Sequence, residues 1–92
     1  MRIKVQFHGI LSDWVGAAEA EFALHQGSQL GDLLYFVGKR YAGKMPEQLW
    51  DKEENAFVRS VWAMRGNEKI QNLNEPLKDG EKIRFLLMQA GG

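Results

Sequence analysis

The residues best suited to do chemistry are the last two of the sequence, Gly91 and Gly92. Two glycines form the thinnest extended chain available, with no Cβ atoms to clash inside a narrow pocket. A terminal carboxylate is a poor electrophile, so it must be activated before its acyl carbon can react. We therefore expect Gly92 to be the reacting group and Gly91 to give it access to a partner's active site.

The rest of the chain offers few reactive groups. It has no cysteine, which excludes disulfides, thiolate metal sites, a cysteine nucleophile and a cysteine persulfide. The two histidines, His8 and His25, are too few and too differently placed for a metal site. No phosphate-binding glycine loop, paired carboxylates or nucleophile–base set occurs. We expect no metal, no cofactor bound by the chain itself and no catalysis by the chain alone.

Composition indicates one small domain. The sequence has 92 residues, 45% of them hydrophobic, with 12 basic and 12 acidic side chains. Such a chain builds one core, and its cancelling charges give no net attraction to nucleic acid or to an anionic membrane. No apolar run approaches the ~20 residues of a membrane span, and the first residues alternate instead of forming a signal peptide. A cytoplasmic protein is expected, without nucleic-acid or membrane partners.

The first half of the chain shows a strand, a second strand and a helix. Apolar residues alternate with polar ones over 2–8 and again over 18–24, which predicts two strands paired as a hairpin, interrupted by Gly9 and Ser12-Asp13. An apolar stripe at helical spacing predicts a helix over 30–41, with Ser28 as its N-cap and Asp32 in its first turn. The stripe consists of Leu30, Leu33, Leu34, Val37 and Tyr41.

The second half is less regular until its last strand. Residues 44–56 indicate only a short helical turn and an exposed loop. A third strand is predicted over 57–64 without a clear buried face, followed by a short edge strand at 69–70 and a connection over 73–77 packed down by its two leucines. Asp79-Gly80 is a turn signal, and residues 81–88 form the last strand.

These elements predict an α+β fold, with one main helix packed across a mixed sheet of four to five strands. The first and last strands lie side by side in its centre if the helical crossover is right-handed. That arrangement is the ubiquitin-like β-grasp. We expect a single domain over 1–92, with 89–92 as a flexible C-terminal tail.

A docking surface is expected on the last strand. If Ile83, Phe85 and Leu87 face the helix, the opposite face carries Arg84, Leu86 and Met88. Exposed apolar groups beside the tail indicate partner binding, unless another strand or segment 44–56 covers them. Trp62 either joins this face or, as we favour, packs on the helix. The predicted partner-binding residues are Arg84, Leu86, Met88, Gln89 and Ala90.

Three segments give the chain a resemblance to the MoaD/ThiS family of sulfur carriers, which are relatives of ubiquitin. They are the first strand followed by Gly27-Ser28-Gln29-Leu30-Gly31-Asp32-Leu33-Leu34, then Pro76-Leu77-Lys78-Asp79-Gly80-Glu81-Lys82-Ile83, and the final Ala90-Gly91-Gly92. The chain departs from the family at Met64-Arg65-Gly66, where a valine-asparagine-glycine turn is frequent. It also has Leu87-Met88-Gln89 where molybdopterin-synthase small subunits often have prolines.

The resemblance implies a function for the diglycine. A MoeB/ThiF-like enzyme, related to ubiquitin-activating enzymes, would use ATP to adenylate the carboxylate, which sulfide would convert into a thiocarboxylate. The sulfur would then pass to a large, MoaE-like synthase subunit or to another sulfur-accepting enzyme. Molybdopterin or tungstopterin synthesis is the favoured pathway, with thiazole, amino-acid or RNA thiolation as alternatives. Two other readings stay open: a ubiquitin-like modifier joined to lysines through Gly92, and a β-grasp adaptor with an idle tail.

Overall fold

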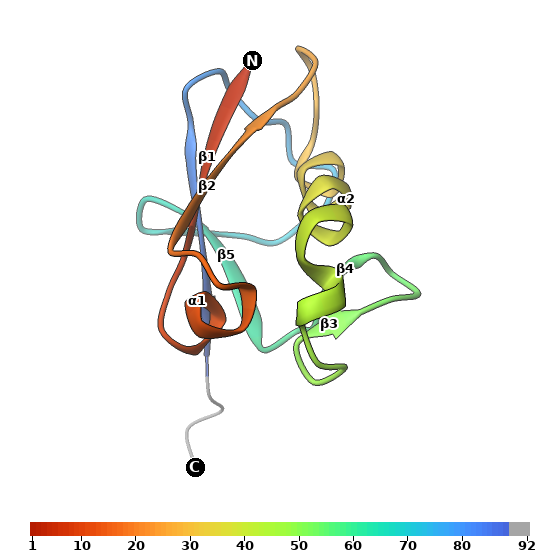
Figure 1. Cartoon of the computed structure of the whole chain (residues 1–92). Helices are drawn as coiled ribbons and strands as arrows, with labels where there is room; N and C mark the ends of the chain where they lie inside the picture. The colour runs from red at the N-terminus through yellow and green to blue at the C-terminus, as the bar shows by residue number, and fades with distance from the viewer. Residues whose placement is uncertain (89–92) are drawn as a thin grey trace.

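The computed structural model describes residues 1–88, and Figure 1 shows a twisted sheet with the main helix packed across one of its faces. Its elements are β1 (Arg2–Phe7), α1 (Ile10–Val15), β2 (Glu19–Ala23), α2 (Leu30–Tyr41), the 3-10 turn η1 (Ala42–Lys44), β3 (Trp50–Asp51), β4 (Ala56–Phe57), β5 (Val61–Arg65), β6 (Glu68–Ile70) and β7 (Lys82–Leu87). Within residues 1–88, no helix is long and apolar enough to cross a membrane.

The main sheet has five strands in the order β2-β1-β7-β5-β6. Strand β1 runs parallel to β7 and antiparallel to β2, while β5 is antiparallel to both β7 and β6. The first and last strands are therefore neighbours, as the β-grasp prediction requires. The expected fold class is confirmed.

The core lies between the sheet and α2, and the alternating residues of the strands fill it as expected. Ile3 and Val5 of β1 and Ile83 of β7 are fully buried, and the ring centroids of Phe7 and Phe85 lie 6.2 Å apart. On the helix side, the predicted stripe is buried along its whole length. The core is thus built from strand side chains that repeat every two residues and helix side chains that repeat every 3.6 residues.

Helix α2 spans the predicted residues, but its N-cap is Gln29 and not Ser28. Gln29 and Asp32 form a capping box, in which the backbone N–H of Gln29 donates to a carboxylate oxygen of Asp32 at 2.8 Å. The next backbone donors bond to the connection between β6 and β7: Leu30 N–H to the Glu75 carbonyl at 2.9 Å, and Gly31 N–H to the Leu73 carbonyl at 2.7 Å. Ser28 is not needed as a cap because these distant carbonyls satisfy the helix terminus.

The short helix α1 replaces the expected break between the first two strands. Leu11 and Val15, four residues apart, are buried, while Ile10 and Trp14 point outward. Gly16 ends the helix in the left-handed region with a φ of 78°, and its N–H bonds to the Ser12 carbonyl at 2.9 Å. The strand is interrupted at Gly9 and Ser12-Asp13 as predicted, but the sequence did not predict that a helix forms there.

The expected third strand over 57–64 is two elements. Strand β4 pairs with β3 in a separate two-stranded sheet beside α2, and β5 joins the main sheet after a turn in which Val61 N–H bonds to the Val58 carbonyl. Met45, Leu49 and Trp50 are buried in this region. The expected short helical turn is present, because the Leu49 and Trp50 N–H groups bond to the Pro46 carbonyl, whereas the β3–β4 pair was not expected. The backbone of Gly38 in α2 allows this approach, because a Cβ there would lie 2.6 Å from the Trp50 ring.

Three smaller expectations for the second half had mixed outcomes. The edge strand near 69–70 is present as β6, and Gly80 turns the chain with a φ of 80°. The connection over 73–77, however, is packed down by only one of its leucines: Leu77 is buried and Leu73 is 46% exposed.

Candidate functional site

The last strand presents two different faces. Ile83 and Phe85 of β7 are buried against the helix layer, and the intervening side chains lie on the open face of the sheet. The register places Trp62 of β5 opposite Leu86 and Met64 opposite Arg84, so these pairs share that face. On the open face, side chains of β5 and β7 therefore lie next to each other, and β7 ends shortly before residues 89–92.

An apolar cluster forms at the end of β7, and we call Trp62, Leu86 and Met88 the open-face patch. All three are partly exposed. Pairing with the β5 side continues one residue past β7, because Met88 N–H donates to the Ser60 carbonyl at 2.7 Å. The expectation that Trp62 packs on the helix was wrong: Val61 and Ala63 take the inward positions of β5, which turns Trp62 outward.

Cations lie on the same face of the sheet as this patch. Lys4 of β1 lies opposite Lys82 of β7, and the Lys69 ammonium lies 4.1 Å from the centroid of the Trp62 ring. The Arg84 guanidinium is fixed by donating to the Gly66 carbonyl at 2.7 Å. A partner that covers the open-face patch would therefore also meet Lys69 and Arg84 beside its apolar centre.

The outer strand of the same face is acidic. Glu19 of β2 accepts a hydrogen bond from the Gln6 side chain at 2.8 Å. This bond, together with the nearby charges of Lys4 and Lys82, lowers the pKa of Glu19. The open face is thus polar at β2 and apolar at β5 and the end of β7.

The start of β7 is held by a polar cluster around Arg65, which we call the Arg65 lock. Arg65 donates through Nε to Glu81 and through its Nη atoms to Glu75 and to the Pro76 carbonyl, both at 2.9 Å. Partial burial favours the neutral form, but the bonds and charges of Glu81 and Glu75 outweigh it and raise the pKa of Arg65. The lock ties β5 to the connection that leads into β7.

Sequence reasoning missed two apolar residues at the end of the sheet where β7 finishes. His8 N–H bonds to the Phe85 carbonyl at 3.0 Å, which brings the chain leading into α1 beside the end of β7 (Figure 1). Ile10 and Trp14 on the outer side of α1 are 48% and 45% exposed. The helical spacing of Ile10 and Trp14, and of Leu11 and Val15, was the signal that could have identified this exposed apolar pair.

The structure brings Arg84, Leu86 and Met88 together with Trp62, while Gln89, Ala90, Gly91 and Gly92 lie outside the described residues. His8 and His25 are exposed. Residues 1–88 contain no group of three or more His, Cys, Asp or Glu side chains that could hold a metal ion.

The fold and this last strand define a ubiquitin-like β-grasp, and comparison with solved structures agrees. SAMP1 from Haloferax volcanii superimposes with a TM-score of 0.82 at 13% identity, covering 100% of both chains. A putative molybdopterin converting factor subunit 1 from Pyrococcus furiosus gives a TM-score of 0.74 at 22% identity over 97% of this chain and 99% of that one. In the Helicobacter pylori complex of molybdopterin-converting factor subunits 1 and 2, the TM-score is 0.64 at 23% identity over 100% of both chains.

Comparisons with family models and with curated proteins give no match. At these identities, the structural likeness shows the fold. The resemblance drawn from the sequence is confirmed at that level, because molybdopterin converting factor subunit 1 (MoaD) is among the structures that share it.

Proposed function

We propose that the chain is a sulfur carrier whose reacting group is the Gly92 carboxylate. The observation that carries this proposal is the position of β7: a central strand that leads directly into Gln89-Ala90-Gly91-Gly92, with the open-face patch beside its end. A rigid sheet fixes the docking surface, and the glycines supply a chain thin enough for a partner's active site.

The reaction needs two steps. In the first, a Gly92 carboxylate oxygen attacks the α-phosphate of ATP, forming an acyl-adenylate and releasing pyrophosphate. In the second, sulfide (HS⁻) attacks the acyl carbon and AMP leaves with the C–O bonding pair, giving a thiocarboxylate and releasing a proton. The chain provides the acyl group, and a MoeB/ThiF-like enzyme provides the nucleotide site and the catalysis.

The partners would dock on Arg84, Leu86, Met88, Gln89 and Ala90, together with Trp62. Apolar side chains at the centre of an interface supply most of its binding energy, and Met88 adapts its shape to more than one partner. The same surface would serve first the activating enzyme and then the sulfur acceptor. An acceptor like a large molybdopterin-synthase subunit is favoured by the fold shared with molybdopterin converting factor subunit 1.

The test is intact-mass measurement after incubation with a MoeB/ThiF-like enzyme from the same organism, ATP and sulfide. The proposal expects a mass increase equal to one oxygen replaced by one sulfur, and no increase without ATP. A variant lacking Gly92 should bind the enzyme and gain no sulfur. An unchanged mass, with an enzyme shown to bind the chain and to load its own carrier, would refute the proposal.

A second candidate is a protein modifier, favoured by the likeness to the small archaeal modifier protein 1 of Haloferax volcanii. The adenylate would then be attacked by a lysine amine, directly or through an enzyme thioester, to give an isopeptide. Tryptic peptides that carry residues 85–92, the remnant left after cleavage at Arg84, on lysines of other proteins would support this outcome. Such conjugates should disappear when Gly92 is deleted.

A further inference from the structure

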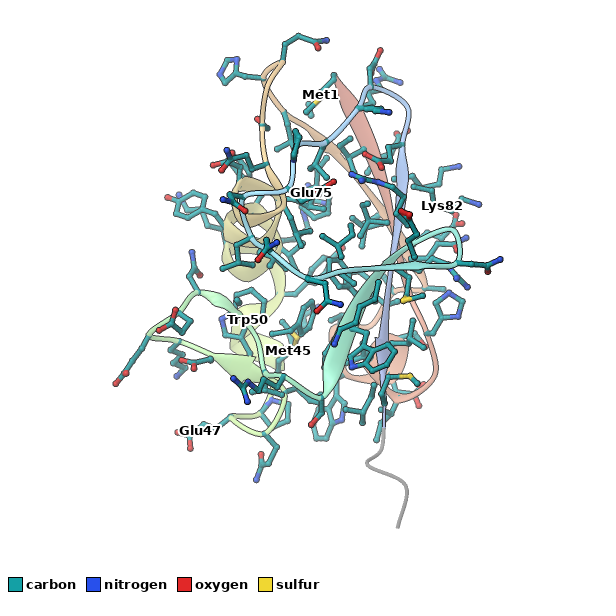
Figure 2. All side chains as sticks on the ribbon, turned by 180° about the vertical axis from the view of Figure 1, so that it is seen from behind. Met1, Met45, Glu47, Trp50, Glu75 and Lys82 are labelled. Atoms are coloured by element: carbon teal, nitrogen blue, oxygen red, sulfur yellow. The ribbon has the colours of Figure 1, made fainter. Side chains whose placement is uncertain are left out.

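A cleft of about 500 Å³ opens between the β6 edge of the sheet and α2. In Figure 2, the connection that follows β6 crosses from the sheet toward α2, with Glu75 on its far part, and the β3–β4 sheet with Trp50 lies below it. The cleft lies under this connection and extends to residues 56–61. The cleft shares Trp62 and Lys69 with the open face of the sheet, but its apolar floor lies on the helix side of the sheet.

The cleft exists because β6 is short. Strand β6 pairs only with residues 63–65 of β5, so Val61 and Trp62 have no partner on that side. The chain then leaves the sheet at Ile70 and is fastened to the start of α2 by the Leu73 carbonyl, which accepts the Gly31 N–H at 2.7 Å. The connection thus forms an arch that is held at both ends.

The floor of the cleft is apolar and reaches the core. Leu30 and Leu34 of α2 line it and are buried, and so is Phe85 of β7. The Phe57 ring forms one wall, its centroid 4.9 Å from that of Phe85. An alkyl chain or an aromatic ring entering here would contact aliphatic and aromatic carbon atoms.

Among the described residues, the charged side chains that line the cleft are both positive, and Glu68 and Glu75 line a neighbouring hollow that shares Lys69 with it. Arg59 and Lys69 line the cleft with the amides Gln71 and Asn72, and no Asp or Glu side chain is among its lining residues. Both cations are exposed, and neither forms an ion pair within residues 1–88. The Lys69 ammonium instead lies over the Trp62 ring.

We propose that this cleft binds a small organic anion with an apolar body, an alkyl or aryl carboxylate. Ligand pockets of roughly 300–1,000 Å³ are mainly apolar, with a few polar groups that fix orientation. Here the body enters between Leu34 and Phe57, and the carboxylate stays at the rim near Arg59 and Lys69. The residues that would hold the apolar body, Leu34 and Phe57, are not part of the proposed docking surface.

The test uses phenylbutyrate as the probe, with phenylbutanol and phenylbutylamine as neutral and cationic analogues of the same body. Amide chemical shifts of the labelled full-length protein are followed during each titration. We expect phenylbutyrate to bind about tenfold more tightly than the alcohol and the amine, with shifts confined to residues 30–34, 56–63 and 69–73. Equal binding of all three analogues, or shifts elsewhere only, would overturn the proposal.

Charge variants at exposed positions test the same point without endangering the fold. The double change Arg59→Glu and Lys69→Glu should weaken phenylbutyrate binding at least tenfold and reverse the preference toward phenylbutylamine. The matched control is Lys52→Glu, which reverses a charge on the exposed loop outside the cleft. Deleting Gly91-Gly92 should leave the affinity unchanged. Unaltered binding by the double variant would contradict the proposal.

Discussion

The two ends of β7 differ in chemistry, because polar contacts hold its start and apolar side chains lie at its end. The strand begins at the Arg65 lock, where one guanidinium bonds to Glu81, Glu75 and a backbone carbonyl. It ends at the open-face patch, where Trp62, Leu86 and Met88 are apolar and only partly covered. Polar groups satisfied within the chain fix a strand in place, whereas apolar groups left uncovered indicate a partner. The comparison predicts that changes at the start reduce stability and that changes at the end reduce binding.

The largest expected effect on stability comes from breaking the Arg65 lock. Arg65→Met leaves Glu81, whose side chain is 10% exposed, without its cation. We expect a loss of about 2 kcal/mol, less than the roughly 3–5 kcal/mol for a fully buried pair, because Arg65 is itself 27% exposed and solvent screens the charges. Urea unfolding measures this loss. Lys69→Met on the same hairpin is the control, and an equal loss there would show that the lock has no special role.

The next largest effect is expected on partner binding, from a change at the end of β7. Leu86→Asp should weaken binding to the activating enzyme at least tenfold, about 1.4 kcal/mol, because a charge would enter the apolar centre of the interface. Its effect on the free energy of unfolding should stay below about 1 kcal/mol because the side chain is partly exposed. Calorimetric titration and urea unfolding measure the two quantities.

The matched control for that variant is Phe36→Asp. Phe36 is 42% exposed on α2 and lies outside the open-face patch. It should bind the activating enzyme as the unaltered chain does. If Phe36→Asp weakens binding as much as Leu86→Asp, the sheet face is not the docking surface.

A smaller effect is expected from the turn that leads into β7. An Asp79 carboxylate oxygen accepts the Arg2 backbone N–H at 2.9 Å, which joins this turn to the start of β1. Asp79→Ala should cost about 1 kcal/mol, the value of an ordinary hydrogen bond. Hydrogen exchange at Arg2 should accelerate, while the neighbouring Lys78→Ala should change neither quantity.

The smallest effect is the pH response of Glu19. Its pKa is lowered by the hydrogen bond from Gln6 and by Lys4, so the ionised form favours the folded state. Its contribution is present above the ordinary pKa of 4.5 and is lost as the pH falls through the lowered value in the folded protein. A carboxyl NMR titration of Gln6→Ala should move the pKa of Glu19 upward. No movement would assign the shift to the lysines alone.

The sequence predicted those parts of the fold in which a buried face repeats with one period. Strands β1 and β7 and helix α2 were found because Ile3, Val5 and Phe7, or Leu30 and Leu34, each follow a single spacing. Helix α1 is only six residues long, and its one buried pair was hidden by a polar Ser12-Asp13. Residues 57–64 were read as one strand because β-forming residues lie on both sides of the turn at 59–60.

The candidate site was likewise predicted from the sequence only in part. The alternation of β7 placed Leu86 on the outer face correctly, but the position of Trp62 depended on a register that only the folded sheet fixes. The Arg65 lock was invisible because its carboxylates lie 10 and 16 residues along the chain. The cleft was missed because it arises where β6 stops, which is a property of the sheet and not of a motif.

The most direct test of the carrier proposal is the mass of the C-terminal peptide after activation. The chain is treated with its MoeB/ThiF-like enzyme, ATP and sulfide, then digested and fragmented. The account predicts one oxygen replaced by sulfur at Gly92, at an unchanged rate for Phe36→Asp and a much reduced rate for Leu86→Asp. An unmodified Gly92, with an enzyme that binds the chain and loads its own carrier, would contradict it.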